Sequence, residues 1–390
     1  MNIEFLYGAL GLSFWGYVLA AVVSLQITIL CVTVYLHRDA AHRALDLHPA
    51  LRHFARFWIW FTAGMLTREW VAVHRKHHAK CETADDPHSP VIVGLRKVLL
   101  EGAELYQVHA RDPDTQEKYG RGTPDDWVER YVYTRHRNAG VIALIVLDLF
   151  LFGVPGIIII AAQMLAMPLL AAGVINGLGH HGGYRNFECP DASTNVVPWG
   201  MLLGGEELHN NHHAFPSSAK FSVRSWEFDI GWLWIRLFAS LGLAKVLRVA
   251  PKLASAPHRH IDLDTLRAVI VNRMHVLRDY TVSVTVPVFK AELRAAHGKL
   301  AGSVKKLLIR EPALLDARAQ RTLSDALAQH HALRTVHEFR ERLRVLWSGA
   351  NMSNERSLAH LKEWIAHAEA SGIQALQEFA ARMRGYALAA

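Results

Sequence analysis

The chain has 390 residues, of which 51% are hydrophobic and 20% charged, and its formal net charge is +8 with a pI near 9.4. This length allows one membrane domain and one soluble domain, and the positive charge favours contact with anionic lipid headgroups or acidic partners. Cys31, Cys81 and Cys189 lie far apart without a CxxC motif, which excludes a disulfide framework and is compatible with a reducing cytosol.

Residues 4–36 form the first long apolar tract, with no charged side chain after Glu4. A single helix of that length would measure about 50 Å and would exceed the ~30 Å hydrocarbon core of a bilayer. We expect one long helix that overshoots the membrane, and a short hairpin broken between Gly11 and Gly16 is the alternative. The N-terminus lacks a basic n-region and a cleavage site, so we expect the tract to be retained as an anchor.

The sequence HRDAAH, at 37–42, ends this tract. On an α-helix a spacing of five places His37 and His42 about 140° apart, which suits two different metals better than one. The next apolar segment, 51–70, is interrupted by arginines and Glu69. A crossing there would separate these histidines from those that follow, so we expect an interfacial segment.

Two copies of His-x-x-His-His, at 74–78 and 209–213, are the strongest motifs in the chain. On a helix, positions i, i+3 and i+4 share a face, so we expect each copy to point three imidazoles at one spot, as a metal site requires. The chain has 24 histidines, and chance would supply only about 0.1 copies of the pattern. With His37 and His42 the motifs give eight nitrogen ligands, which are too many for one tetrahedral zinc and suit two metals.

A second long apolar tract, 139–178, is broken by Gly153-Val154-Pro155-Gly156 and is long enough for two spans joined by a tight turn. Residues 226–247 are amphipathic, and we expect an interfacial helix there. From about residue 258 the apolar residues recur at helical period without a long apolar run. We therefore expect an all-α protein with a membrane-embedded domain at 1–250 and a soluble helical extension at 258–390.

Ligand type alone does not identify the metal, because several metals accept imidazole. A dinuclear site at the mouth of a hydrophobic bundle can receive an acyl chain from the bilayer, and oxidation of an unactivated C–H bond requires activated dioxygen. A membrane hydroxylase of alkanes or lipids fits the same pattern. A metal transporter is a third hypothesis, but transport needs polar residues inside several spans, whereas these histidines cluster outside the spans.

The motifs HRDAAH, HRKHH and HNNHH closely resemble the three histidine boxes of the integral-membrane fatty acyl desaturases of the stearoyl-CoA, delta-9 type. The resemblance extends to EWVAVHRKHHAKCETADDPHSP (69–90), NGLGHHGGYRN (176–186) and GEELHNNHHAFPSSAKFS (205–222), and it covers residues 10 to 250. It implies a helical membrane fold with a cytoplasmic di-iron cap, in the inner or plasma membrane, and we expect a bacterial source.

The resemblance implies two iron ions (Fe2+) and nine histidine ligands, with Asn176 holding one iron through a water. One iron would take His37, His74, His78 and His212, and the other would take His42, His77, His180, His209 and His213. The neighbouring His181 is an alternative to His180, and the Asn-x-x-x-His spacing favours His180. Trp70 is expected at the substrate.

The implied reaction uses O2 and two electrons to remove two hydrogens from adjacent methylenes, giving a cis double bond, usually at carbon 9, and water. We expect a separate electron donor, either a ferredoxin with a flavoprotein reductase or a cytochrome b5-like protein, because no fused cytochrome b5 signature is visible. Acyl-CoA members carry Arg-Asp where this chain has Ala72-Val73, which favours an acyl lipid over acyl-CoA. The extension resembles helical segments of bacterial transposases but lacks a catalytic carboxylate triad, and we do not expect nucleic acid as a partner.

Overall fold

The computed structural model describes residues 6–255, 260–296, 301–348 and 353–388, and these residues form an all-α fold, as the sequence predicts. The chain divides into two compact units, Met1–Arg185 with Ala192–Ala250 and Asn186–Asp191 with Pro251–Ala390. The predicted start of the extension, residue 258, lies outside the described residues.

One continuous helix, Phe14–Ala41, carries the N-terminal apolar tract. It is α-helical over α1 (Phe14–Leu30) and widens into a π-helix over η2 (Cys31–Ala41). The Ser13 hydroxyl caps the helix by accepting the Gly16 N–H at 3.3 Å. The expectation of one long helix is confirmed, although the helix begins at Phe14 and not at residue 4.

Two helices, α2 (Pro49–Ala63) and α3 (Thr67–Lys80), replace the single segment expected over 51–70. Gly64 ends α2 with φ at +61°, a conformation that glycine adopts without steric cost. Among the described residues α2, with 15 residues, is not one of the helices that have the length and apolarity of a membrane span, and the interfacial position of this segment stays a prediction.

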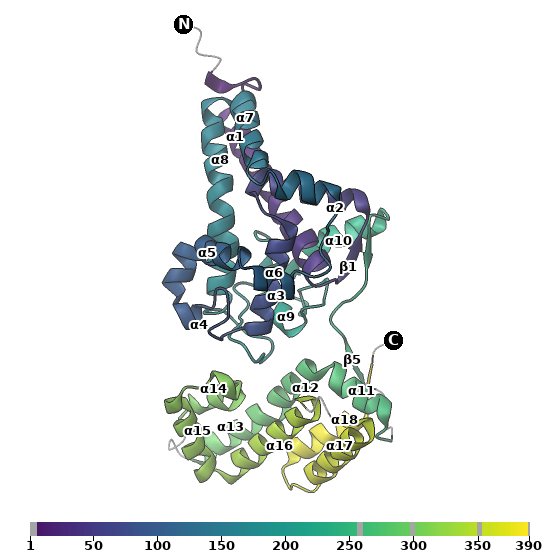
Figure 1. Cartoon of the computed structure of the whole chain (residues 1–390). Coiled ribbons are helices and arrows are strands. Elements are labelled where there is room, and N and C mark those ends of the chain that lie inside the picture. Colours follow the sequence, from purple (N-terminus) through teal and green to yellow (C-terminus); the bar gives the residue numbers. More distant parts are fainter. Residues whose placement is uncertain (1–5, 256–259, 297–300, 349–352, 389–390) are drawn as a thin grey trace. The chain divides into compact units, whose positions relative to one another are not determined.

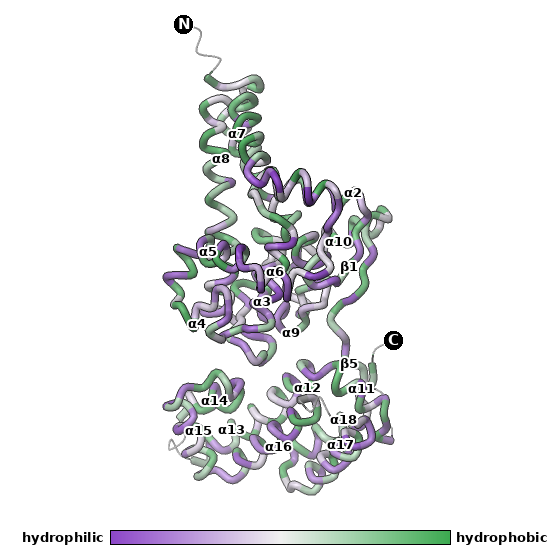
Figure 2. The backbone as a smooth tube through the Cα atoms, in the orientation of Figure 1, coloured by the Kyte–Doolittle hydropathy of each residue, from purple (hydrophilic) through white to green (hydrophobic). Residues whose placement is uncertain are grey.

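The second apolar tract forms the predicted helical hairpin. Helix α7 (Ala139–Phe152) turns at Gly153 into α8 (Val154–Met167), which continues as the π-helix η4 (Pro168–Leu178). Figure 1 shows α8 beside α7 and α1, and Figure 2 colours the backbone of α7 and α8 mostly as hydrophobic. The continuous helix Val154–Leu178 and the N-terminal helix Phe14–Ala41 have the length and apolarity of membrane spans. Helix α7 is apolar but has 14 residues, fewer than the roughly 20 of a typical span, so of the two spans expected in this tract only α8 with η4 has span length among the described residues, and the crossing by α7 stays a prediction.

The rest of the first unit packs around the histidine motifs. Its helices are α4 (Pro90–Val93), α5 (Leu95–Ala110), α6 (Pro113–Tyr119), η3 (Glu129–Thr134), α9 (His209–Ala214) and α10 (Ile230–Ser240). Strand β1 (Leu45–Leu47) pairs antiparallel with β4 (Ala244–Val246), and β2 (Trp199–Gly200) pairs parallel with β3 (Phe228–Asp229). Helix α10 occupies the middle of the segment for which the sequence predicts an interfacial helix.

The second unit has its own apolar core. In this core the rings of Tyr280 and Phe379 are nearly perpendicular, with centroids 5.0 Å apart. Its elements are β5 (Leu253–Ser255), α11 (Leu263–Val271), α12 (Arg273–Tyr280), η5 (Thr281–Thr285), α13 (Val286–Ala295), α14 (Val304–Ile309), η6 (Pro312–Leu314), α15 (Ala317–Gln329), α16 (His331–Ser348), α17 (Asn354–Glu369), α18 (Gln374–Arg384) and β6 (Tyr386–Leu388), and β5 pairs antiparallel with β6. Residues 251–390 hold 21 Lys and Arg against 13 Asp and Glu, so the whole excess of positive charge belongs to this part of the chain.

Candidate metal centre

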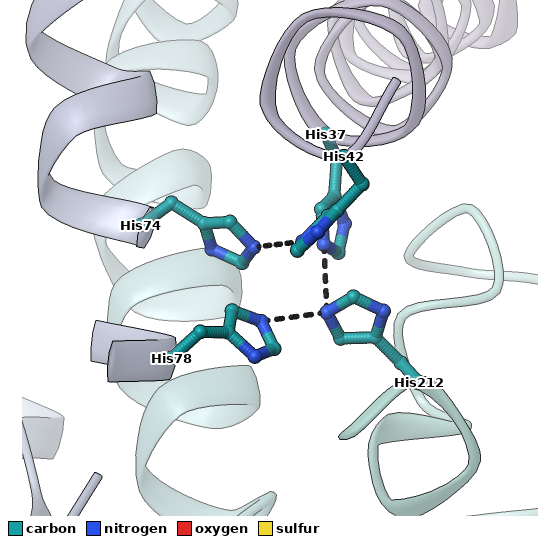
Figure 3. A group of neighbouring side chains, drawn as sticks. All are labelled: His37, His42, His74, His78 and His212. Carbon is teal, nitrogen blue, oxygen red and sulfur yellow. Dashed lines mark hydrogen bonds between the residues drawn. The ribbon is translucent and has the colours of Figure 1, made fainter. Parts of the chain in front are cut away.

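Five histidines form the first of two groups of ring nitrogens, which we call the five-histidine group (Figure 3). Their ligand atoms all lie within 4.8 Å of one another: His37, His42, His74, His78 and His212. The Nε2 atom of His212 lies 3.0 Å from that of His37 and 2.8 Å from that of His78. Nitrogens about 2.1 Å from a common ion and at right angles around it are roughly 3.0 Å apart. The spacing therefore suits one metal ion.

Four more histidines form the second group, the four-histidine group, with ligand atoms also within 4.8 Å of one another: His77, His180, His209 and His213. The Nε2 atom of His180 lies 3.2 Å from that of His77 and 3.0 Å from that of His209. His180 is 2% exposed, whereas His181 is exposed to solvent. The structure thus brings together all nine histidines named from the sequence and leaves His181 outside.

The structure places His42 differently from the expected division of ligands, because it lies in the five-histidine group with His37. The α-helical spacing assumed for HRDAAH is wrong: the segment is a π-helix, in which the His42 N–H donates to the His37 carbonyl at 3.1 Å. A π-helical turn joins residues i and i+5, so the two rings lie on one face with centroids 5.0 Å apart.

The two His-x-x-His-His motifs differ from the expectation based on helical spacing, because each is shared between the groups, as in the ligand division that the resemblance implies, and does not point three imidazoles at one spot. In α3, His74 and His78 face the five-histidine group and His77 faces the other. In α9 the arrangement is reversed, and only His212 faces the five-histidine group. The i, i+4 pair and the i+3 residue point to neighbouring places on one helix face, so one motif serves two adjacent centres.

Carboxylates orient three of the rings. The Nδ1 atom of His37 contacts Glu206 at 2.8 Å, that of His77 contacts Asp86 at 2.9 Å, and that of His180 contacts Glu82 at 2.9 Å. A carboxylate on Nδ1 fixes the ring and leaves Nε2 for a metal. Sequence reasoning missed these acids; Asp86 lies in the Asp-Pro-His run and Glu206 precedes the third box, but Glu82 is 98 residues from its partner.

Burial determines the charge of the site. It lowers the pKa of His74, His78, His209 and His212 well below 6.5, and the neighbouring rings lower it further, so these imidazoles are neutral near pH 7 with free lone pairs. Burial by itself would raise the pKa of Asp86, but the contacts with His77 and His88 outweigh it and lower the pKa to about 2.

His88 is a further buried histidine that the sequence did not single out. With His77 and Asp86 it makes a third set of close ligand atoms, and its ring centroid lies 4.3 Å from that of His77. Its backbone N–H donates to Asp86 Oδ1 at 3.1 Å, the same oxygen that contacts His77. The set therefore shares its members with the four-histidine group and supports the position of His77.

A cavity of about 280 Å³ runs alongside the centre. Its wall includes His37, His74 and His209 together with apolar side chains of α8 and η4, and Asn176 lies on this wall, on η4. Trp70 also lines it and stacks on His74, with ring centroids 4.9 Å apart and planes 13° apart. An apolar channel beside ring nitrogens suits a long apolar substrate.

Two buried histidine groups beside an apolar channel are the arrangement of a metal-dependent enzyme that acts on an apolar substrate. A model of the family described as Fatty acid desaturase matches residues 12–240, and the chain belongs to this family. Separately, a family model described as Transposase matches residues 266–388, within the second unit.

Curated relatives are similar over the same region. The chain is 30% identical to Delta-9 acyl-lipid desaturase 2 of Arabidopsis thaliana over 56% of this chain and 70% of the relative. It is 31% identical to Acyl-CoA C20 Delta5-desaturase of Anemone leveillei over 56% of this chain and 69% of the relative. It is 28% identical to sn-1 stearoyl-lipid 9-desaturase of Synechocystis sp. (strain ATCC 27184 / PCC 6803 / Kazusa) over 65% of this chain and 76% of the relative.

The prediction of a fatty acyl desaturase is confirmed: the protein is an oxidoreductase that desaturates fatty acyl chains. The family is iron-dependent and membrane-associated, in agreement with the histidine groups and the two long apolar helices. These relatives come from plants and a cyanobacterium and act on both acyl lipids and acyl-CoA by name, so they leave the bacterial source and the substrate carrier as predictions.

Proposed function

We propose that this protein introduces a cis double bond at carbon 9 of a saturated fatty acyl chain carried by a phospholipid, using O2 and two electrons at a di-iron centre. The observation that carries the proposal is the apolar cavity whose wall includes histidines of both groups, His37 and His74 from one and His209 from the other. A reacting methylene in this cavity is placed beside both metal positions.

The five-histidine group would hold one iron, and the four-histidine group would hold the other together with a water on Asn176. The chemistry of the donors fits a cation. The Nδ1 atoms of His77 and His180 contact carboxylates, so both rings carry their proton there and direct bare Nε2 lone pairs at each other across 3.2 Å. Two lone pairs repel at that distance unless both coordinate one positive ion. When bound, the iron centre supplies the oxidising power that C–H removal requires.

The protein's own residues position the substrate and keep the site dry. Apolar side chains of α8 and η4 exclude water from the channel, and Trp70, stacked on His74, forms part of the wall next to the reacting carbons. Glu206, Asp86 and Glu82 keep three rings from rotating and balance positive charge at the centre. Rigid ligands and a rigid wall fix which two methylenes react.

An acyl lipid is favoured as the substrate carrier. Val73 is 2% exposed and lines the cavity, and Ala72 is completely buried. Neither side chain offers charge to a CoA phosphate, and two of the relatives described above are acyl-lipid desaturases by name. Acyl-CoA is the alternative carrier.

We place the active site on the cytoplasmic side of an inner or plasma membrane, with electrons from a separate ferredoxin and flavoprotein reductase or a cytochrome b5-like protein. The desaturase domain would comprise residues 1–250, and the extension at 258–390 would be a separate helical domain whose role is unassigned.

The carrier is tested by reconstituting the purified full chain with iron and an electron-transfer system in vesicles. One sample contains saturated phospholipid, and another contains saturated acyl-CoA in vesicles of fully unsaturated lipid. We expect at least as much monounsaturated product from the phospholipid. Strict dependence on acyl-CoA would contradict the carrier, and hydroxylated products would identify a hydroxylase.

A further inference from the structure

An amide, Gln163, lines the cavity from α8, whose other side chains are apolar. The cavity-lining residues of the continuous helix Val154–Leu178 run from Asn176, on η4, to Gln163. These two positions are 13 residues apart, about three turns along the helix. Gln163 is 5% exposed, and of the cavity-lining residues on this helix it lies farthest along the chain from His180.

A hydrogen bond holds this amide in place. The Gln163 Nε2 atom donates to the Ser24 hydroxyl on α1. Thr62 of α2 also lines the cavity, and Thr28 of α1 donates to its hydroxyl at 3.3 Å. The Trp58 indole N–H donates to Thr28 at 2.9 Å. Hydrogen bonds therefore join α1, α2 and α8 in one polar layer beside the channel.

The tether makes Gln163 a stiffer wall than its neighbours. Met164 and Met167 also line the cavity, and methionine side chains change rotamer readily to accommodate a guest. Moving Gln163 away from Ser24 would leave two polar groups without partners in apolar surroundings, which costs free energy. Already, the Gln163 Oε1 atom is buried and has no hydrogen-bond partner among the described residues. A terminal methyl group thus meets a fixed stop at Gln163 and an adaptable wall at the methionines.

We propose that Gln163, held by Ser24, determines the maximum length of acyl chain that the enzyme desaturates. This inference rests on the proposed function, and it adds the residue that ends the channel. The next buried side chain of α8 beyond Gln163 is Ile159, one turn further from the histidines, at 3% exposure. Removing the amide would extend the channel toward Ile159 and admit additional methylenes.

The test compares product chain lengths from the full chain reconstituted in vesicles that contain an equimolar series of even-numbered saturated acyl chains. For the first chain beyond the wild-type limit, Gln163→Ala is expected to raise the yield relative to the shorter product at least about tenfold. Ser24→Ala keeps the Gln163 side chain but removes its hydrogen bond to Ser24. We expect this variant also to raise the relative yield of the longer product. Leu165→Ala, on the exposed face of the same helix, is the matched control and is expected to keep the wild-type profile.

The outcomes separate the inference from the function it rests on. A wild-type product profile from an active Gln163→Ala protein would overturn the role of Gln163. If that variant does not fold, an unchanged profile from active Ser24→Ala would overturn the tether and with it the proposal. If the loaded wild-type protein forms no unsaturated product from any chain, the proposed function itself fails.

Discussion

Arg38 and Asp229 form an ion pair from which water is excluded, with Nη2 and Oδ1 2.9 Å apart and both side chains fully buried. Arg38 follows the ligand His37, and Asp229 caps α10 by accepting the Trp232 N–H. The Arg38 guanidinium also donates to the backbone carbonyls of Ala219 and Gly204. One cation thus fastens the helix that carries the first histidine box to three other segments of the unit.

Asp229→Ala is predicted to destabilise the protein by about 3–5 kcal/mol, because it leaves the Arg38 charge buried without its partner. Thermal or denaturant unfolding of the protein in detergent measures the loss. Asp46→Ala removes an exposed partner of Arg52 and should change stability by less than about 1 kcal/mol. Equal effects of the two substitutions would show that the buried pair has no special structural role.

His42→Ala is predicted to lower bound iron by about half and to abolish activity, because only the five-histidine group loses a ligand. Iron is counted by elemental analysis of the purified protein. His48→Ala is the matched control, since His48 is exposed and serves as the N-cap of α2. Full iron content in His42→Ala would exclude His42 from the ligand set.

Asp86→Asn is predicted to weaken metal binding about 10- to 100-fold while the protein still folds, because an amide orients His77 less firmly and adds no negative charge. Metal competition with a chelator measures the affinity. The neighbouring Asp85 is exposed and pairs with Lys80 outside the site, so Asp85→Asn should keep wild-type affinity. The same loss in both variants would assign the effect to general surface charge.

The metal-free protein is predicted to lose stability as the pH falls below 6.5. Burial lowers the pKa of His74, His78 and His209 in the folded state, so below 6.5 the unfolded chain binds more protons than the folded protein. Stability therefore rises with pH in this window and is lost on acidification. Melting temperatures measured at intervals between pH 8 and pH 5 test this, and a melting temperature that rises as the pH falls from 6.5 would contradict it.

Several features of the site were predictable from local sequence because they depend on spacing along one helix. The nearness of the histidines within each His-x-x-His-His motif is of this kind, although the division of each motif between two groups does not follow from helical period, and Gly153 and Pro155 mark the hairpin. The helix that carries His37 and His42 was predicted with the wrong geometry, because a π-helix has no composition that distinguishes it from an α-helix.

Features that depend on tertiary contacts were not predictable from the sequence. Glu82 is one acid among many until the fold brings it 2.9 Å from His180. Gln163 reads as an isolated polar residue in an apolar tract, and only the cavity and the contact with Ser24 give it a role. Gly64 ends helix α2, and glycine is a common residue at helix ends. The apolar residues on both sides nevertheless make the sequence look like one continuous segment.

The central claim is that the nine histidines drive acyl desaturation, and product analysis tests it most directly. Total fatty acids, with double-bond positions, are determined by gas chromatography–mass spectrometry from host cells that express the wild-type chain, His180→Ala or His181→Ala together with an electron donor. We predict a new monounsaturated acid, with its double bond at carbon 9, in cells with the wild-type protein and with His181→Ala, because His181 is exposed and lies outside both groups. Its absence is predicted for His180→Ala, and the same acid from that variant at wild-type yield would contradict the account.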